Sequence, residues 1–69
     1  MIYHLKGAEF IELIKLLKLL RIASSGGVAK MMVEDGEVKL NGNPESRKRA
    51  KLRNGDIVQI FGKEIMIQP

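Results

Sequence analysis

A helical repeat of apolar residues dominates the first third of the chain. Five apolar side chains recur at the spacing of one face of an α-helix: Phe10, Leu13, Ile14, Leu17 and Leu20. The pattern predicts a first helix from Glu9 to Leu20 with this face against the core. Ile11, Leu16 and Leu19 fall outside that face. We expect either later strands or a partner protein to cover these three side chains.

A second, shorter helix is predicted after a break at residues 21–24. Ser24 or Ser25 suits the N-cap, because a serine oxygen accepts hydrogen bonds from the free N–H groups of a first helical turn. Gly36 suits the stop, since glycine adopts the left-handed conformation that commonly follows a helix. Three apolar side chains of this helix are expected to face the core: Val28, Met31 and Met32.

Two glycines, Gly26 and Gly27, follow the serine cap, although glycine in a helix costs about 1 kcal/mol relative to alanine. In one interpretation, the missing side chains let a phosphate or a base approach the free N–H groups at the positive end of the helix. In the other, they let this turn pack tightly against the first helix. The sequence alone leaves both open.

The remaining chain reads as short strands joined by turns. Residues 2–5 form a short strand or an extended lead-in, residues 45–52 form an edge strand or extended loop, and strands are predicted at 37–40, 57–61 and 64–67. Three dipeptides mark turns: Asn41-Gly42, in a loop that Pro44 should lengthen, Asn54-Gly55, and Gly62-Lys63. The expected fold class is α+β, with two helices packed on a small, mainly antiparallel sheet in one domain, residues 1–69.

Composition limits the possible chemistry. A chain of 69 residues has a thin core and little room for a deep pocket, so no small-molecule substrate is expected. It has no cysteine, which excludes a disulfide, a thiolate nucleophile and a cysteine metal site. The only histidine, His4, has no second histidine to complete a metal site, and no cofactor is expected.

No stretch resembles a signal peptide or a membrane span. The most apolar window, residues 10–22, is too short for a bilayer and is interrupted by four charged residues. We therefore expect a cytoplasmic protein.

The residue types of a catalytic triad are present but are not expected to act together. Ser24 and Ser25 are explained as caps, and His4 lies at the opposite end of the chain. Glu34 and Asp35 are adjacent on a helix and so do not face each other. The glycine pair lacks the Lys-Ser/Thr of a phosphate-binding Walker loop. The chain is not expected to be an enzyme.

Positive charge is concentrated in one quarter of the chain. Five cations lie within seven residues: Arg47, Lys48, Arg49, Lys51 and Arg53. Residues 37–53 carry a net charge of +4, whereas residues 1–36 carry +1 and residues 54–69 carry −1. A local excess of this kind favours polyanions, because each phosphate that Lys or Arg neutralises releases counterions. A solvated basic loop or a nuclear-type address is the alternative interpretation.

The order of motifs resembles the RNA-binding domain named after ribosomal protein S-four of the small subunit. The motifs are the SGG-x-AK helix, the G-x-V-x-x-N-G turn, the run E-S-R-K-R-x-K-L and a G-D pair before a strand. They extend from about residue 13 to residue 58, and the chain is most similar to small bacterial proteins that consist of this domain alone. The resemblance implies an αL-type RNA-binding motif, in which two helices and the following strand and turn form one surface.

Carried over by motif, the RNA-facing positions are Lys18, Ser25, Gly26, Gly27, Lys30, Lys39, Asn41, Arg47, Lys48, Arg49 and Lys51, and the basic run adds Arg53. Gly36, Gly42, Gly55 and Asp56 match turn positions. The chain departs from the family at Pro44 and in the Arg-Lys-Arg run, where ribosomal members carry a more varied polar stretch. The family's RNA target is therefore a weak guide to this one. The related pseudouridine synthases and tyrosyl-tRNA synthetases catalyse with a separate domain.

We expect a monomer that contacts phosphates through Arg47, Lys48, Arg49 and Lys51. Lys30 and residues 25–27 would set the register, and Asn41 would reach a base or a 2′-hydroxyl. The resemblance favours structured RNA, ribosomal or tRNA-like, over DNA. An aromatic share of 4% argues against a platform that stacks successive bases. The alternatives are a double-stranded DNA binder and a protein-interaction module, in which Ile11, Leu16 and Leu19 supply an apolar contact.

Overall fold

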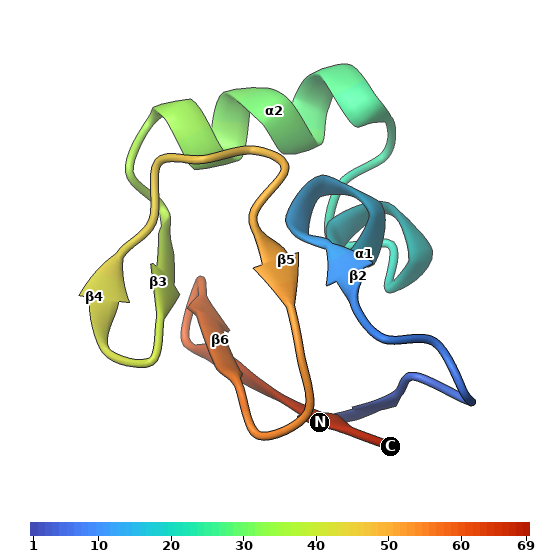
Figure 1. The fold of residues 1–69 in the computed structure, drawn as a ribbon. Helices are drawn as coiled ribbons and strands as arrows, with labels where there is room; N and C mark the ends of the chain where they lie inside the picture. Colours follow the sequence, from blue (N-terminus) through green and yellow to red (C-terminus); the bar gives the residue numbers. More distant parts are fainter.

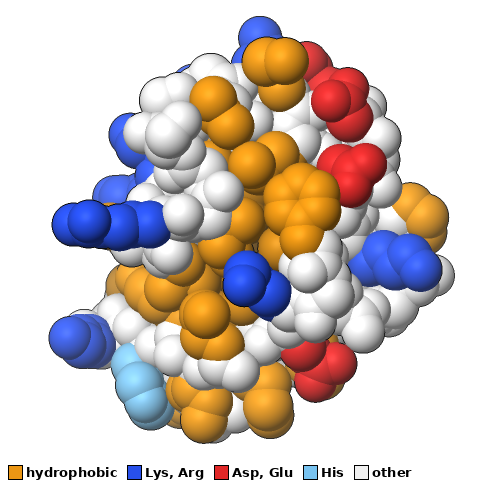
Figure 2. Space-filling view, turned by 180° about the vertical axis from the view of Figure 1, so that it is seen from behind, with side chains coloured by type: hydrophobic (Ala, Val, Ile, Leu, Met, Phe, Trp, Pro, Cys, Tyr) orange, Lys and Arg blue, Asp and Glu red, His pale blue; other side chains and the backbone are white.

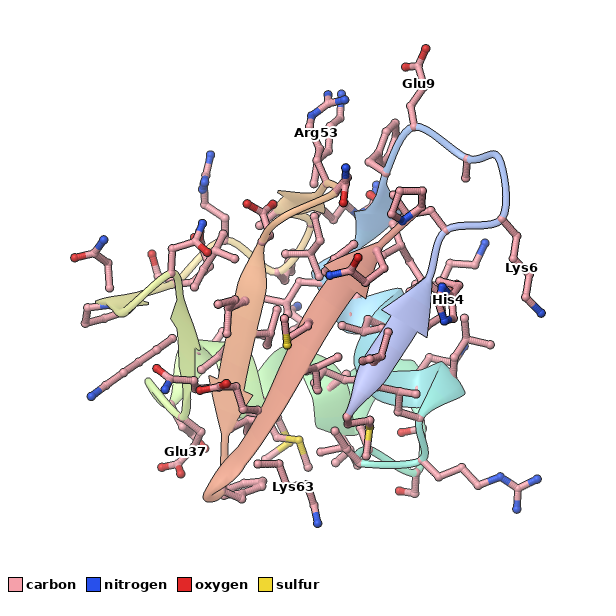
Figure 3. The ribbon with its side chains drawn as sticks, turned by 90° about the horizontal axis from the view of Figure 1, so that it is seen from below. His4, Lys6, Glu9, Glu37, Arg53 and Lys63 are labelled. Carbon is pink, nitrogen blue, oxygen red and sulfur yellow. The ribbon has the colours of Figure 1, made fainter.

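Both helices lie on one side of a five-stranded sheet in the computed structural model, which describes residues 1–69 (Figures 1 and 3). Helix α1 spans Leu13–Leu19 and helix α2 spans Gly26–Glu34. Neither helix has the length and hydropathy needed to cross a membrane.

The five-stranded sheet is mixed, with one parallel pair. Its strand order is β1 (Ile2–His4), β7 (Lys63–Gln68), β6 (Ile57–Ile60), β3 (Val38–Leu40) and β4 (Asn43–Pro44). Only β1 and β7 run parallel. The prediction of an α+β fold with two helices and a mainly antiparallel sheet is confirmed.

A second, two-stranded sheet changes the start of the first helix. Strand β2 (Ile11–Glu12) pairs with β5 (Lys51–Leu52) in antiparallel register, forming what we call the β2–β5 ribbon. The prediction that the helix begins at Glu9 is therefore wrong. The apolar pattern of residues 9–12 fits a helix locally, but pairing with a strand about forty residues later overrides it.

The ribbon also decides which apolar residues are buried. Ile11 points into the core opposite Leu52, and Leu16 is fully buried, so only Leu19 of the three predicted outlying side chains is exposed. The protein-interaction alternative loses two of its three apolar contacts.

Helix α2 packs through smaller residues than predicted. Ala29 and Val33 form its buried face, whereas Val28 and Met32 are only partly buried. The expectation that Met31 faces the core is wrong, since 60% of this residue is exposed. The pair Ala29 and Val33 lies four residues apart on one helical face, and the small alanine leaves room for α1 to approach.

Both ends of α2 form as predicted. The Ser25 hydroxyl accepts a hydrogen bond from the Val28 N–H at 3.2 Å, which makes Ser25 the N-cap. Gly36 follows the helix with a φ of +79°. The Gly36 N–H donates to the Val33 carbonyl and the Glu37 N–H to the Met32 carbonyl, so these two carbonyls near the end of the helix are satisfied.

Two hairpin turns differ from their predictions. Asn41 and Gly42 alone join β3 to β4, because Pro44 pairs with Lys39 within the edge strand and does not lengthen the loop. In the second hairpin, Ile60 pairs with Lys63, so the turn residues are Phe61 and Gly62, one position earlier than predicted. Both residues of each turn have positive φ, the conformation of a primed hairpin turn.

Phe61 is strained in this position, with a φ of +50° that an aromatic residue rarely adopts. We expect Phe61→Asn to raise the free energy of unfolding by about 1 kcal/mol, because asparagine tolerates left-handed backbone better. Phe61 is 56% exposed, so little packing is lost. Chemical denaturation tests this, with Phe61→Leu as a control that keeps the strain. Equal stability of the two variants would contradict the explanation.

Candidate nucleic-acid interface

A buried carboxylate organises the basic loop, which we define as residues 45–50. Glu45 is only 8% exposed. Its Oε2 accepts hydrogen bonds from the Arg47 backbone N–H at 2.9 Å and from Arg47 Nε at 3.0 Å, and its Oε1 accepts one from Nη2 at 3.1 Å. The Arg47 side chain remains 76% exposed. Glu45 therefore fixes one edge of the guanidinium and leaves the rest available to a ligand.

The charge pair shifts the pKa of the Glu45 carboxyl below its ordinary value of 4.5. Hydrogen bonding from the Arg47 side chain is the main cause, and it outweighs burial, which acts in the opposite direction. The same pairing raises the pKa of Arg47 above its ordinary value. Ionised Glu45 therefore stabilises the loop more than the protonated carboxyl would.

This pairing predicts a loss of stability in acid. Because the pKa of Glu45 is lower in the folded than in the unfolded chain, its contribution is complete above about pH 4.5 and disappears as pH falls through the lower, folded value. We expect the free energy of unfolding of the native protein to fall more steeply below about pH 4.5 than that of Glu45→Gln. Urea denaturation at several pH values measures both slopes. Parallel slopes would contradict the assignment.

Cations of the loop and the following strand surround one depression. Arg47, Arg49 and Lys51, with Ala50 at the base, line a shallow hollow of about 360 Å³, which we call the arginine hollow. The Ala50 N–H donates to the Arg47 carbonyl at 3.1 Å, so residues 47–50 form a turn that brings Arg47 and Arg49 to the same side as Lys51, the first residue of β5. The sequence prediction placed these three residues on one surface, and here they share one concavity.

Lys48 turns from the loop toward α2, along which the loop runs in Figure 1. The neighbouring Lys30 ammonium, a like charge, lowers the pKa of Lys48. Two neighbouring ammonium groups repel each other, and an anion placed between them would remove that repulsion. The structure therefore brings Lys30 and Lys48, eighteen residues apart in the chain, close together, with the carboxylate of Glu34 also near Lys48.

The start of α2 is not tightly packed against the rest of the protein. A Cβ atom added at Gly26 would lie 3.7 Å from Lys18 Cδ, and one added at Gly27 would lie 3.9 Å from Ser25 Oγ, both ordinary contact distances. Packing against α1 therefore requires neither glycine. The N–H groups of Gly26 and Gly27 have no acceptor within the protein. Lys18 and Arg21 line a hollow beside this turn.

Of the predicted site residues, Asn41 is already hydrogen-bonded within the protein, and Lys39 lies apart from these cations. The Asn41 amide donates to Asp56 Oδ1 at 3.0 Å and accepts from the Ile57 N–H at 2.8 Å, so it ties the β3–β4 turn to the chain before β6. Lys39 is exposed but lines a different hollow, with Glu37 and Gln59. Asn41 acts here as a structural link.

Phe10 is a feature that the sequence did not indicate. The Lys51 ammonium lies 4.9 Å, and the Arg53 guanidinium carbon 5.5 Å, from the centre of its ring. Both distances suit cation–π contacts. The apolar pattern places Phe10 on the core face of a helix, and only the pairing of β2 with β5 shows that it meets these cations. In Figure 3, Arg53 projects near Glu9, at the end of the molecule opposite Lys63.

The two broad faces of the molecule differ in character. The basic loop lies on the near side of Figure 1. Figure 2 views the molecule from behind and shows apolar side chains in a band down the middle of that face.

The structure contains no group of three His, Cys, Asp or Glu side chains that could hold a metal ion.

Comparison with known proteins gives consistent matches. The family model described as "S4 domain" matches residues 3–68. A Bacillus subtilis (strain 168) protein named "Probable ribosome maturation protein RlbA" is 43% identical over 54 residues, which cover 78% of this chain and 76% of the relative. An Escherichia coli (strain K12) protein named "Putative RNA-binding protein YbcJ" is 39% identical over 57 residues, covering 83% and 81% respectively.

The solution structure of YbcJ from E. coli superimposes with a TM-score of 0.75 at 34% sequence identity. The match covers 99% of this chain and 86% of that one. The YbcJ structure is described as revealing an "alfaL" motif involved in RNA binding.

Proposed function

Because the chain belongs to the S4 domain family, we propose that it is a non-catalytic RNA-binding protein whose ligand is structured ribosomal RNA. The family resemblance inferred from the sequence motifs is thereby confirmed. The name of the Bacillus relative connects that protein with ribosome maturation, and we extend this role to the present chain as part of the proposal.

The observation that carries the proposal is the convergence of cations from two separate segments. Arg47, Arg49 and Lys51 surround one hollow, and Lys48 meets Lys30 of α2. Phosphates of a folded RNA would enter the hollow and neutralise both groups, releasing counterions. Arginine adds planar donors that match phosphate oxygens.

The start of α2 provides the second contact. Its free N–H groups at Gly26 and Gly27 lie at the positive end of a nine-residue helix, beside Lys18. Without side chains at these two positions, an RNA backbone can approach the main chain closely. This accounts for two glycines that internal packing does not require.

Gly27→Ala separates binding from stability. We expect this change to raise the free energy of unfolding by up to about 1 kcal/mol, because alanine favours the helix and its Cβ fits. We also expect several-fold weaker RNA binding, because the methyl group occupies the approach to the N–H groups. Thermal denaturation and fluorescence anisotropy measure the two effects. Higher stability with unchanged affinity would remove this turn from the interface.

Crosslinking to RNA in cells that express the protein, followed by sequencing, tests the proposed function. We expect discrete sites in structured ribosomal RNA. Diffuse signal over all transcripts would overturn it. In a parallel binding assay, equal affinity for a DNA duplex and an RNA duplex of the same sequence would favour the double-stranded DNA alternative.

A further inference from the structure

The outer face of the β2–β5 ribbon carries an unusual set of side chains. Ile11 and Leu52, which face each other across the ribbon, point into the core. Side chains alternate along a strand, so Glu12 and its partner Lys51 point outward. Phe10, two residues before Glu12, and Arg53, two residues after Lys51, point to the same outer side. One outer face thus combines an aromatic ring, a carboxylate and two cations.

A small hollow adjoins this face. It measures about 190 Å³ and is lined mainly by apolar side chains, including Tyr3 and Phe10, with Glu12 and Lys15 as its charged groups. Two of the three aromatic residues of the chain therefore border one depression, the aromatic hollow. Its volume is below the roughly 300–1,000 Å³ of pockets for drug-sized ligands, so it suits a single planar ring.

The Glu12 carboxylate has no internal role that explains it. It is half-buried at the N-cap of α1, yet it makes no side-chain capping bond. It also forms no ion pair, although Lys51 is its cross-strand neighbour. A carboxylate next to a phosphate-binding surface repels RNA unless it accepts hydrogen bonds from a donor on that RNA. The N–H groups of a base edge are such donors.

The two charged groups together match the hydrogen-bonding edge of one base. Glu12, at the N-cap of α1, and Lys15, in the first turn of that helix, line the same hollow. The exposed edge of an unpaired guanine presents two adjacent N–H donors, which suit a carboxylate, next to the O6 acceptor, which suits an ammonium group. Adenine, cytosine and uracil do not combine two adjacent donors with an acceptor.

We propose that the aromatic hollow binds one unpaired guanine of the RNA, packed against Phe10 and Tyr3, while Lys51 and Arg53 contact the flanking phosphates. This inference rests on the proposed RNA-binding function and deepens it. Lys51 also lines the arginine hollow, so the base site and the phosphate site are continuous. A single bound base needs no platform for successive bases.

Four short RNA duplexes test the proposal: one fully paired, and three identical except for a single bulged G, A or U. Anisotropy titrations at one salt concentration give the affinities. We expect the bulged-G duplex to bind roughly tenfold more tightly than the paired duplex, as one base–aromatic contact allows. Glu12→Gln should bring bulged G to the level of bulged A. The matched control is Glu9→Gln, an identical charge change at an exposed residue outside the hollow.

Phe10 supplies a second, independent comparison. Phe10→Tyr keeps the ring and should keep the preference for bulged G, whereas Phe10→Leu should lose it. The preference is measured as the ratio of the affinities for bulged-G and paired RNA, so that a change in the phosphate contacts of Lys51 and Arg53, which affects both RNAs, cancels. Equal binding of bulged and paired RNA by the native protein would overturn the guanine site but leave the proposed function intact. Equal effects of Glu12→Gln and Glu9→Gln would also overturn it. No binding of any of the four RNAs would overturn both.

Discussion

Reversing the charges of Arg49 and Lys51 together is expected to weaken RNA binding roughly hundredfold at about 0.1 M salt. Both side chains are exposed and line the arginine hollow, and neither forms an ion pair within the protein. The slope of log affinity against log salt concentration should fall by about two, one for each lost phosphate contact. Anisotropy titrations of a ribosomal RNA fragment over a salt series measure both quantities.

The matched control for this variant is Lys6→Glu/Lys63→Glu. It changes net charge by the same amount at two exposed lysines that lie away from Arg53 in Figure 3. If both double variants lose the same affinity and slope, net charge alone controls binding and the hollow has no special role. Arg47 is a poor choice for such reversals. A glutamate there would stand beside the buried Glu45 and disrupt the loop, so lost binding would have two explanations.

Glu45→Ala is expected to weaken RNA binding several-fold although it makes the protein more positive. Removing the carboxylate releases the Arg47 guanidinium and leaves the Arg47 backbone N–H without an acceptor. We expect the free energy of unfolding to fall by about 1–3 kcal/mol, the range for buried hydrogen bonds to charged groups. Calorimetry and anisotropy measure the two effects.

If net charge alone controlled affinity, Glu45→Ala would bind RNA more tightly than the native protein. If the shape of the basic loop controls affinity, Glu45→Ala binds RNA more weakly. Glu9→Ala adds the same positive charge without touching the loop, and we expect it to leave affinity unchanged or slightly raised. Tighter binding by Glu45→Ala than by the native protein would show that the shape of the basic loop is unimportant. The affinity of Glu45→Gln for RNA should fall between those of Glu45→Ala and the native protein, because glutamine keeps an acceptor for the Arg47 N–H.

Local signals in the sequence predicted much of the fold. The serine cap and Gly36 defined both ends of α2 because caps depend on neighbouring residues only. The strand around Val38 followed from alternation, and the strand around Val58 followed from its apolar residues between two turns. The start of α1 was mispredicted because residues 9–12 satisfy a helical pattern, and only Leu52, far along the chain, makes them a strand.

Some features of the candidate site could likewise be predicted from the sequence, and others could not. The basic run is a property of composition, so its residues were evident from the sequence. The bond between Glu45 and Arg47, the approach of Lys48 to Lys30 and the cation contacts of Phe10 depend on three-dimensional neighbours. Asn41 shows the converse, since its position in a recognised motif did not reveal that its amide is already bonded to Asp56.

The basic loop has no regular secondary structure, yet its backbone forms part of the framework of the fold. The carbonyl groups of Ala50 and Lys48 accept the first N–H groups of α1, from Leu13 at 2.9 Å and Ile14 at 3.1 Å, and the Glu45 N–H donates to the Val38 carbonyl. Such a loop cannot swing as a lid without uncapping a helix. The protein therefore enters the complex preorganised, with little ordering entropy to lose, and the RNA must supply whatever adjustment of shape binding requires.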